Sequence, residues 1–213
     1  MAHDGQQPVE PEMARPGEAE LIARAVKELL IEKGIISAAE VRRTVEATDR
    51  RNPEQGRRMV ARAWVDPAFK ARLLADGAAA AGELGIDTLG TRLVVLENTP
   101  KVHNLVVCTL CSCYPRAILG LPPDWYKSRP YRSRAVNQPR AVLAEFGTEI
   151  APEVEVRVHD STADMRYLVL PMQPPGSEGM DQAALAELVT RDCMIGVSLP
   201  LGRGERAADR AEE

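Results

Sequence analysis

Apolar residues recur at helical spacing through the first third of the chain. From Glu18 onward, aliphatic positions lie three or four residues apart until Gly34, which predicts an amphipathic helix ended by a glycine cap. The sequence Ser37-Ala38-Ala39-Glu40 is a capping box, so we expect a second helix that continues to about Thr48. Two further helical stretches are expected beyond it, at residues 55–64 and in a short helix that begins at Pro67.

Short apolar runs rich in β-branched residues replace the helical pattern after about residue 87. Such runs are typical of buried strands, and helical patterns separate them. Strands are predicted at residues 93–96, 102–107, 154–158, 166–170 and 194–199. Helices are predicted from Trp125 to about Phe146, with a break at Pro139, and at residues 181–190.

This order of elements predicts an α+β fold, with an N-terminal helical arm followed by a layered α/β body. We expect a flexible arm at residues 1–17, a helical arm at 18–86, an α+β domain at 87–202 and a charged tail at 203–213. Long amphipathic helices that precede a body need a cover for their apolar faces. The helical arm is therefore expected to contact a partner subunit.

Composition narrows the class of protein. The 213 residues are 45% hydrophobic and 27% charged, which is typical of globular proteins and excludes wholesale disorder. Charges and prolines interrupt every apolar stretch, and the first six residues are acidic and polar, so we expect no membrane span, no secretory signal and a cytoplasmic location. The net charge is −4, so the sequence lacks the excess of positive charge that is typical of nucleic-acid-binding proteins.

Three of the four cysteines, Cys108, Cys111 and Cys113, lie within six residues, and only Cys193 lies elsewhere. A disulfide framework does not suit this spacing, which favours a metal or redox site. A structural zinc ion would need a fourth ligand, and the nearby His103 lies inside an apolar run. A dithiol redox pair, or thiols that merely pack as small hydrophobic groups, are further interpretations.

The backbone offers another interpretation of the same loop. The peptide nitrogens of Ser112 and Cys113 can point into the ring that the three sulfurs form. Deprotonated amides are strong-field donors, so three sulfurs and two such nitrogens make five sites of an octahedron. That set suits a low-spin trivalent cobalt or iron ion and leaves one position for water or substrate.

The cysteine segment is long enough to carry a family resemblance. Residues 108–115 read Cys-Thr-Leu-Cys-Ser-Cys-Tyr-Pro, with Leu-Glu-Asn-Thr-Pro at 96–100 and Leu-Gly-Leu-Pro-Pro-Asp-Trp-Tyr-Lys at 119–127. This segment resembles the α subunit of nitrile hydratase and the related γ subunit of thiocyanate hydrolase, over about residues 18–200. Thr109 is similar to the cobalt-type members, which have threonine where iron-type members usually have serine.

The resemblance implies a metal centre and its chemistry. Cys108, Cys111 and Cys113 would supply sulfur ligands, and Ser112 and Cys113 backbone nitrogen ligands, to a non-corrin cobalt(III) ion, with iron(III) as the less favoured metal. It also implies that Cys111 is oxidised to a sulfinate and Cys113 to a sulfenate. The Cys113 oxygen would then act as nucleophile or base toward the C≡N carbon, so Cys113, Cys111 and Ser112 are the candidate catalytic residues.

The resemblance also implies partners and a reaction. In this family arginines from a β-type subunit, in some members split into two chains, donate to the oxidised sulfurs, and an activator or metallochaperone inserts cobalt. The implied activity is hydration of a nitrile to an amide. The alternative within the family is hydrolysis of thiocyanate to carbonyl sulfide and ammonia, and the alternative outside it is a non-enzymatic zinc module.

Several residues depart from the nitrile hydratase pattern and bear on the substrate. Arg116-Ala117 stands where Trp-Pro is common, Leu89 stands near the position of a common glutamine, and Tyr114 adjoins the cysteines. We expect Tyr114, Arg116 and Leu89 to form the substrate pocket, although Arg116 could instead form an ion pair at a subunit interface. Asp160 and Arg166 match residues that hold the metal loop, or form a cross-strand ion pair. His159 and Cys193 are further departures, the first from a tryptophan.

Overall fold

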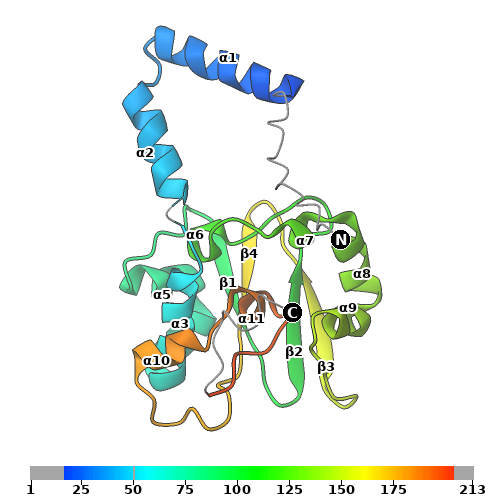
Figure 1. Cartoon of the computed structure of the whole chain (residues 1–213). Coiled ribbons are helices and arrows are strands. Elements are labelled where there is room, and N and C mark those ends of the chain that lie inside the picture. Colours follow the sequence, from blue (N-terminus) through cyan, green and yellow to red (C-terminus); the bar gives the residue numbers. More distant parts are fainter. Residues whose placement is uncertain (1–16, 50, 204–213) are drawn as a thin grey trace, which may run out of the picture. The chain divides into compact units, whose positions relative to one another are not determined.

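The computed structural model describes residues 17–49 and 51–203 (Figure 1). The expected flexible arm and charged tail therefore lie outside the described residues, except for Gly17 and Arg203. Internal contacts divide the chain into two compact units, Met1–Ala47 and Thr48–Glu213. This division differs from the expected boundary between residues 86 and 87, because the helices just after the first unit pack into the core of the second.

The first unit contains α1 (Glu18–Glu32) and most of α2 (Ala38–Asp49). The capping box forms as expected: Ser37 N donates to Glu40 Oε2 at 2.7 Å, and Glu40 N donates to Ser37 Oγ at 3.2 Å. Gly34 has a φ of +68°, which suits its place after α1. Within the described part of the chain, no residue of α1 is buried. About half of the side chain is exposed at each of four apolar residues of α1, namely Leu21, Ile22, Val26 and Leu29.

Three helices begin the second unit: α3 (Glu54–Val65), α4 (Pro67–Ala75) and α5 (Gly77–Glu83). Asp66 caps α4 by accepting a hydrogen bond from Phe69 N at 3.0 Å, and Pro67 occupies the first helical turn. The sequence pattern did not predict α5, a seven-residue helix with the sequence Gly-Ala-Ala-Ala-Ala-Gly-Glu. Buried side chains from α3 and α4 explain why these helices join the second unit, namely Met59, Val60, Phe69 and Leu73.

Four strands form two parallel pairs, β1 (Arg92–Glu97) with β4 (Met165–Leu170) and β2 (Val102–Val107) with β3 (Glu155–Asp160). They confirm the first four predicted strands to within two residues. β2 also contacts β4, and Figure 1 shows the two pairs beside one another. In the β2–β3 register the last residues of both strands are partners, so the loops that follow them start at the same edge.

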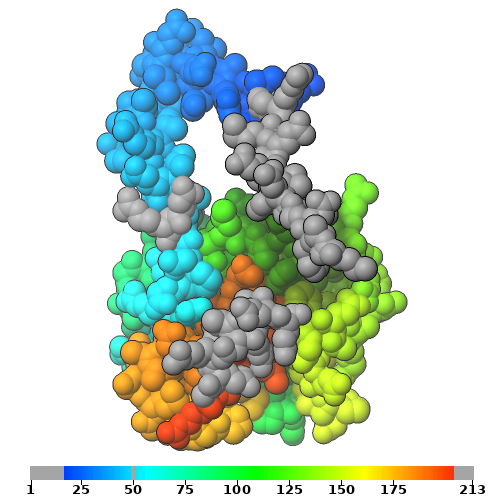
Figure 2. Space-filling model, in the orientation of Figure 1, coloured from blue at the N-terminus to red at the C-terminus, as the bar shows by residue number. Residues whose placement is uncertain are grey.

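Helices cover the strands on different sides. The other helices of this unit are α6 (Arg116–Leu119), α7 (Asp124–Lys127), α8 (Arg129–Asn137), α9 (Pro139–Glu145), α10 (Gln182–Glu187) and α11 (Arg191–Ile195). Figures 1 and 2 show α8 and α9 on the side of β3, and α3 with α10 on the opposite flank. The break predicted at Pro139 separates α8 from α9. The α+β fold class is confirmed.

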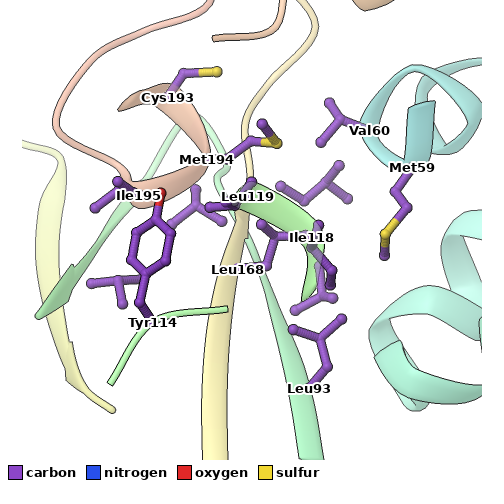
Figure 3. Close-up of a cluster of buried hydrophobic side chains, with 14 of the residues drawn as sticks. Met59, Val60, Leu93, Tyr114, Ile118, Leu119, Leu168, Cys193, Met194 and Ile195 are labelled. Carbon is purple, nitrogen blue, oxygen red and sulfur yellow. The ribbon is translucent and has the colours of Figure 1, made fainter. Parts of the chain in front are cut away.

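The predicted strand at 194–199 is wrong, because the chain forms helix α11 and then turns. Thr190 caps this helix by accepting from Cys193 N at 3.1 Å, and Gly196 ends it with a φ of +90°. A short buried apolar run cannot be assigned to a strand or a helix from periodicity alone. Figure 3 shows the α11 side chains beside those of α3, α6 and β4 in one apolar core.

Within residues 17–49 and 51–203, no helix is both long and apolar enough to cross a membrane.

Candidate metal centre

The three clustered cysteines lie on the loop that leaves the buried end of β2. Cys108 directly follows the strand and is buried, Cys113 is half-buried and Cys111 is exposed. The Cys111 sulfur lies 3.4 Å from that of Cys108 and 3.3 Å from that of Cys113. All three sulfurs are within 4.8 Å of one another, so one ion can contact them all.

Backbone groups of the loop face the same sulfurs. Hydrogen bonds with the Cys113 and Cys108 thiols and with the backbone of Ser112 lower the pKa of the Cys111 thiol to about 7. The backbone of Cys113 makes a smaller contribution of the same sign. Burial and the neighbouring Cys111 raise the pKa of Cys113 to about 12. The loop therefore holds one easily ionised thiol, and thiolate is the form that binds metals.

The donor set fits a metal ion better than a disulfide or a closed zinc site. Among the described residues, Cys108, Cys111 and Cys113 are the one group of potential side-chain ligands close enough to share an ion. His103, the candidate fourth zinc ligand, instead uses Nε2 to contact the carbonyl oxygen of Gly196 at 2.7 Å. A structural zinc ion normally takes four side-chain ligands. An ion of higher coordination number could take further ligands from the loop backbone, whose nearest peptide nitrogens are those of Ser112 and Cys113.

Two side chains anticipated from the sequence anchor the loop from outside. Asp160 lies at the end of β3, opposite the end of β2, and accepts from Thr109 N at 2.9 Å and from the Thr109 hydroxyl. Arg166 Nε donates to the carbonyl oxygen of Tyr114 at 3.2 Å. Asp160 and Arg166 thus bind loop backbone, which is the role their position suggested.

Two further anchors were missed at the sequence level. Tyr126 donates its hydroxyl to the carbonyl oxygen of Cys113 at 2.8 Å, and Arg132 Nη1 donates to that of Cys111 at 3.1 Å. Both residues come from the helices α7 and α8 that follow the loop. The only available signal was their presence in a helical segment shortly after the cysteines, which does not specify a contact.

A cavity of about 320 Å³ opens beside the cysteine loop. The structure brings all three expected pocket residues, Leu89, Tyr114 and Arg116, to this cavity. Leu89 adopts a φ of +58°, and its N–H donates to Asp87 Oδ1 at 2.7 Å, so a tight turn presents its side chain. The other lining residues are Thr88, Thr91, Cys111, Ser112, Cys113, Ala117 and Arg166.

Tyr114 and Arg116 face different surroundings. The Tyr114 ring is buried edge-on against Tyr126, with ring centroids 5.1 Å apart, and Figure 3 shows it pointing toward Ile195. Its hydroxyl is buried without a hydrogen-bond partner among the described residues, and burial raises its pKa. Arg116 is exposed at the start of α6. The cavity therefore combines an apolar wall with an exposed cation.

The remaining departures lie away from this cavity. His159 is half-buried in β3, and its Nε2 donates to Asn104 Oδ1 at 2.9 Å. Cys193 is buried in α11, where its thiol donates to the carbonyl oxygen of Thr190, and burial raises its pKa to about 11. Neither residue lines the cavity beside the cysteines, so they belong to the scaffold.

A thiol-rich loop at a strand end, beside a small cavity in an α+β body, is the arrangement of a candidate metal-binding subunit. The family model described as nitrile hydratase, alpha chain, matches residues 17–198. The chain therefore belongs to the nitrile hydratase alpha-chain family, which confirms the resemblance found in the sequence.

Individual relatives agree with this assignment. The chain is 51% identical over 197 residues to the low-molecular weight cobalt-containing nitrile hydratase subunit alpha of Rhodococcus rhodochrous, covering 91% of this chain and 95% of the relative. It is 49% identical to the cobalt-containing subunit alpha of Pseudonocardia thermophila, with coverages of 82% and 87%. It is 45% identical to the thiocyanate hydrolase subunit gamma of Thiobacillus thioparus, with coverages of 85% and 79%.

Solved structures show the same fold. A recombinant thiocyanate hydrolase with partially modified cobalt centres matches with a TM-score of 0.82 and 42% identity, over 87% of this chain and 91% of the other. A double mutant of the Fe-type nitrile hydratase of Comamonas testosteroni Ni1 matches with a TM-score of 0.79 and 43% identity, over 87% and 93%.

Proposed function

We propose that this chain is the metal-bearing subunit of a cobalt nitrile hydratase, which adds water to a C≡N bond to give an amide. The observation that carries the proposal is the cluster of three thiols beside a cavity of about 320 Å³. The identity of 51% to a cobalt-containing nitrile hydratase subunit supports it.

Cys108, Cys111 and Cys113 would hold the ion through sulfur, and Ser112 and Cys113 through backbone nitrogen. A cobalt(III) ion bound there would supply Lewis acidity that polarises the C≡N group. We further propose that Cys111 carries a sulfinate and Cys113 a sulfenate. Cys113 lines the cavity, and its oxygen would act as nucleophile toward the nitrile carbon or as base toward the water that attacks this carbon.

The cavity walls orient the substrate. Leu89 contributes an aliphatic surface that suits the hydrocarbon part of a nitrile, and Thr88 and Thr91 contribute short polar side chains. Arg166 lies at the same cavity while it also holds the loop backbone. These features favour a small, neutral molecule whose polar end reaches the cysteines.

Hydrolysis of thiocyanate is a second candidate function, because of one specific observation. Arg116 and Arg166 both line the cavity, so an anion would find two positive charges there. The 45% identity to a thiocyanate hydrolase subunit gamma supports this alternative. An anionic substrate is favoured if Arg116 and Arg166 contribute most to binding, and a neutral nitrile is favoured if the apolar wall of the cavity contributes most.

The proposed enzyme includes a β-type subunit, in one chain or two, and an activator that delivers cobalt. Oxygens on Cys111 and Cys113 would be anionic and would need donors, which the partner subunit would provide as arginines. The half-exposed apolar side chains of α1 offer a second surface for that subunit. A cytoplasmic location stays a prediction from the sequence.

Metal and mass analysis of the co-expressed complex tests the proposal. One cobalt per chain, with added oxygen on the peptide that contains Cys111 and Cys113, is the expected result. One zinc per chain with unmodified thiols would instead support a structural module and refute the enzyme.

Substrate competition then separates the two reactions. We expect turnover of neutral nitriles, and a complex that hydrolyses thiocyanate but ignores nitriles would refute the first choice. Arg116→Trp should weaken any thiocyanate activity selectively, because it removes a cation from the cavity. Arg157→Trp, on an exposed position of β3, is the control for a bulky surface substitution. Unchanged thiocyanate kinetics in Arg116→Trp would remove Arg116 from the anion argument.

A further inference from the structure

Arg132 of α8 reaches the backbone of the candidate metal loop. Its Nη1 donates to the carbonyl oxygen of Cys111 at 3.1 Å. The side chain is half-buried, and its Nε is buried without a hydrogen-bond partner in the described part of the chain. The side chain therefore packs against the protein as far as Nε, while its end remains accessible at the hydrogen bond to the loop.

The helix that carries Arg132 is fixed to the strand that carries the loop. Ser128 caps α8 by accepting from Tyr131 N at 3.3 Å. The Tyr131 hydroxyl, which is buried, donates to the carbonyl oxygen of Val106 in β2 at 2.7 Å. The guanidinium group therefore has a defined position relative to the end of β2, two residues before Cys108.

The contacted carbonyl belongs to the peptide that also contains Ser112 N. This peptide is trans, and in a trans peptide the C=O and N–H groups point in opposite directions. Holding the Cys111 oxygen toward α8 therefore turns Ser112 N away from α8. The cysteine sulfurs that this nitrogen would have to face lie within 4.8 Å of one another on the same loop.

We propose that Arg132 is a positioning residue for the metal centre: it holds the Cys111–Ser112 peptide so that the Ser112 nitrogen faces the three sulfurs. Its positive charge also lies beside the oxygen that shares the negative charge of a ligating peptide nitrogen. This inference rests on the proposed function, because it gives Ser112 N the role of a ligand. It adds a residue of this chain to the arginines that the partner subunit would supply.

A neighbouring arginine provides a matched control. Arg129 and Arg132 both line a separate hollow of about 460 Å³ that also includes Thr109. Arg129 is exposed, whereas Arg132 carries the hydrogen bond to Cys111. Removing either side chain changes the charge of the same hollow by the same amount, so a difference between the two variants reports the contact with the loop.

The test compares Arg132→Met, Arg132→Lys and Arg129→Met in the complex co-expressed with its partner. The readouts are cobalt per complex, the sulfur-to-cobalt charge-transfer absorption, the rate of cobalt loss to a chelator and the thermal midpoint. Removing an outer partner of a metal ligand typically weakens metal binding by about 10- to 100-fold. We expect cobalt loss from Arg132→Met to be accelerated by at least about 10-fold with a shifted absorption band, intermediate behaviour in Arg132→Lys, and wild-type behaviour in Arg129→Met.

Wild-type absorption and cobalt retention in Arg132→Met would overturn the inference, and so would equal losses in Arg129→Met. A lowered thermal midpoint with an unchanged absorption band would also overturn it, because a merely structural residue behaves in that way. If Arg132→Met fails to fold, Arg132→Lys decides by the same spectroscopic comparison. Absence of cobalt from the wild-type complex would instead refute the proposed function.

Discussion

Replacement of Gly196 by alanine should disrupt the contact between α11 and β2. Gly196 ends α11 with a φ of +90°, a conformation that residues with a Cβ rarely adopt. A Cβ added there would lie 2.0 Å from the carbonyl oxygen of Asn104 and 3.2 Å from the Cα of Leu105. Both atoms belong to the backbone of β2, so no side-chain rotation relieves the overlap.

The magnitude follows from two consequences of the substitution. The left-handed conformation costs a residue with a Cβ about 1–2 kcal/mol. Moving α11 away from β2 breaks the hydrogen bond between His103 Nε2 and the Gly196 carbonyl oxygen, which is 2.7 Å long and stabilises the fold by about 1 kcal/mol. With the loss of packing in this buried region, we expect Gly196→Ala to lower the free energy of unfolding by about 3–5 kcal/mol.

Gly179→Ala is the matched control, because Gly179 has a φ of +80° but no described atom lies within 4 Å of the position that an added Cβ would take. It should lose only the conformational part, about 1–2 kcal/mol. Urea unfolding of the full chain, followed by tryptophan fluorescence, measures both. A difference of about 2 kcal/mol separates the urea midpoints by about 1 M. Equal midpoints for Gly196→Ala and Gly179→Ala would refute the argument that close backbone approach requires this glycine.

Three further predictions concern the polar contacts around the site. Burial, opposed by the hydrogen bond to the Gly196 carbonyl, lowers the pKa of His103 below its ordinary value of 6.5. As the pH falls, His103 is protonated in the unfolded chain at a higher pH than in the folded chain, so the free energy of unfolding should fall below about pH 6.5. Urea midpoints from pH 7.5 to 5.5 measure this decline. An equal decline in His103→Gln would contradict the prediction. Asp160→Asn should accelerate cobalt loss from the complex about 10-fold, because it removes the negative charge that holds Thr109. A chelator assay measures this loss, and unchanged cobalt retention would contradict the role of Asp160. Tyr126→Phe should lower the free energy of unfolding by about 1–2 kcal/mol in urea denaturation, because the Cys113 carbonyl oxygen loses its donor, and an unchanged midpoint would contradict it.

Local patterns predicted much of the fold because their physical causes are local. The capping box depends on Ser37 and Glu40, three positions apart, and it forms as expected. The helix predicted to begin at Pro67 also begins there. The first four predicted strands are short β-branched runs, and they appear within two residues of their predicted bounds. The sequence also indicated a thiol cluster, because cysteines separated by three and two residues on one loop cannot lie far apart.

Features that depend on distant residues were decided only by the tertiary structure. The run at 194–199 looked like a strand, but Thr190 caps a helix there and Gly196 fits against the backbone of β2. Leu89 and Arg116 reach one cavity because the turn before β1 and the cysteine loop lie near each other. The family resemblance anticipated this proximity, but no local spacing shows it.

The anchors of the loop illustrate the same limit. Arg132 and Tyr126 lie 21 and 13 residues beyond their carbonyl partners, and the sequence alone assigns them no contact. Sequence therefore determined which atoms are available to bind a metal, since donor chemistry belongs to residue type. Packing of α7, α8 and β3 around the end of β2 decided how those atoms are oriented, because orientation depends on groups brought together only by folding.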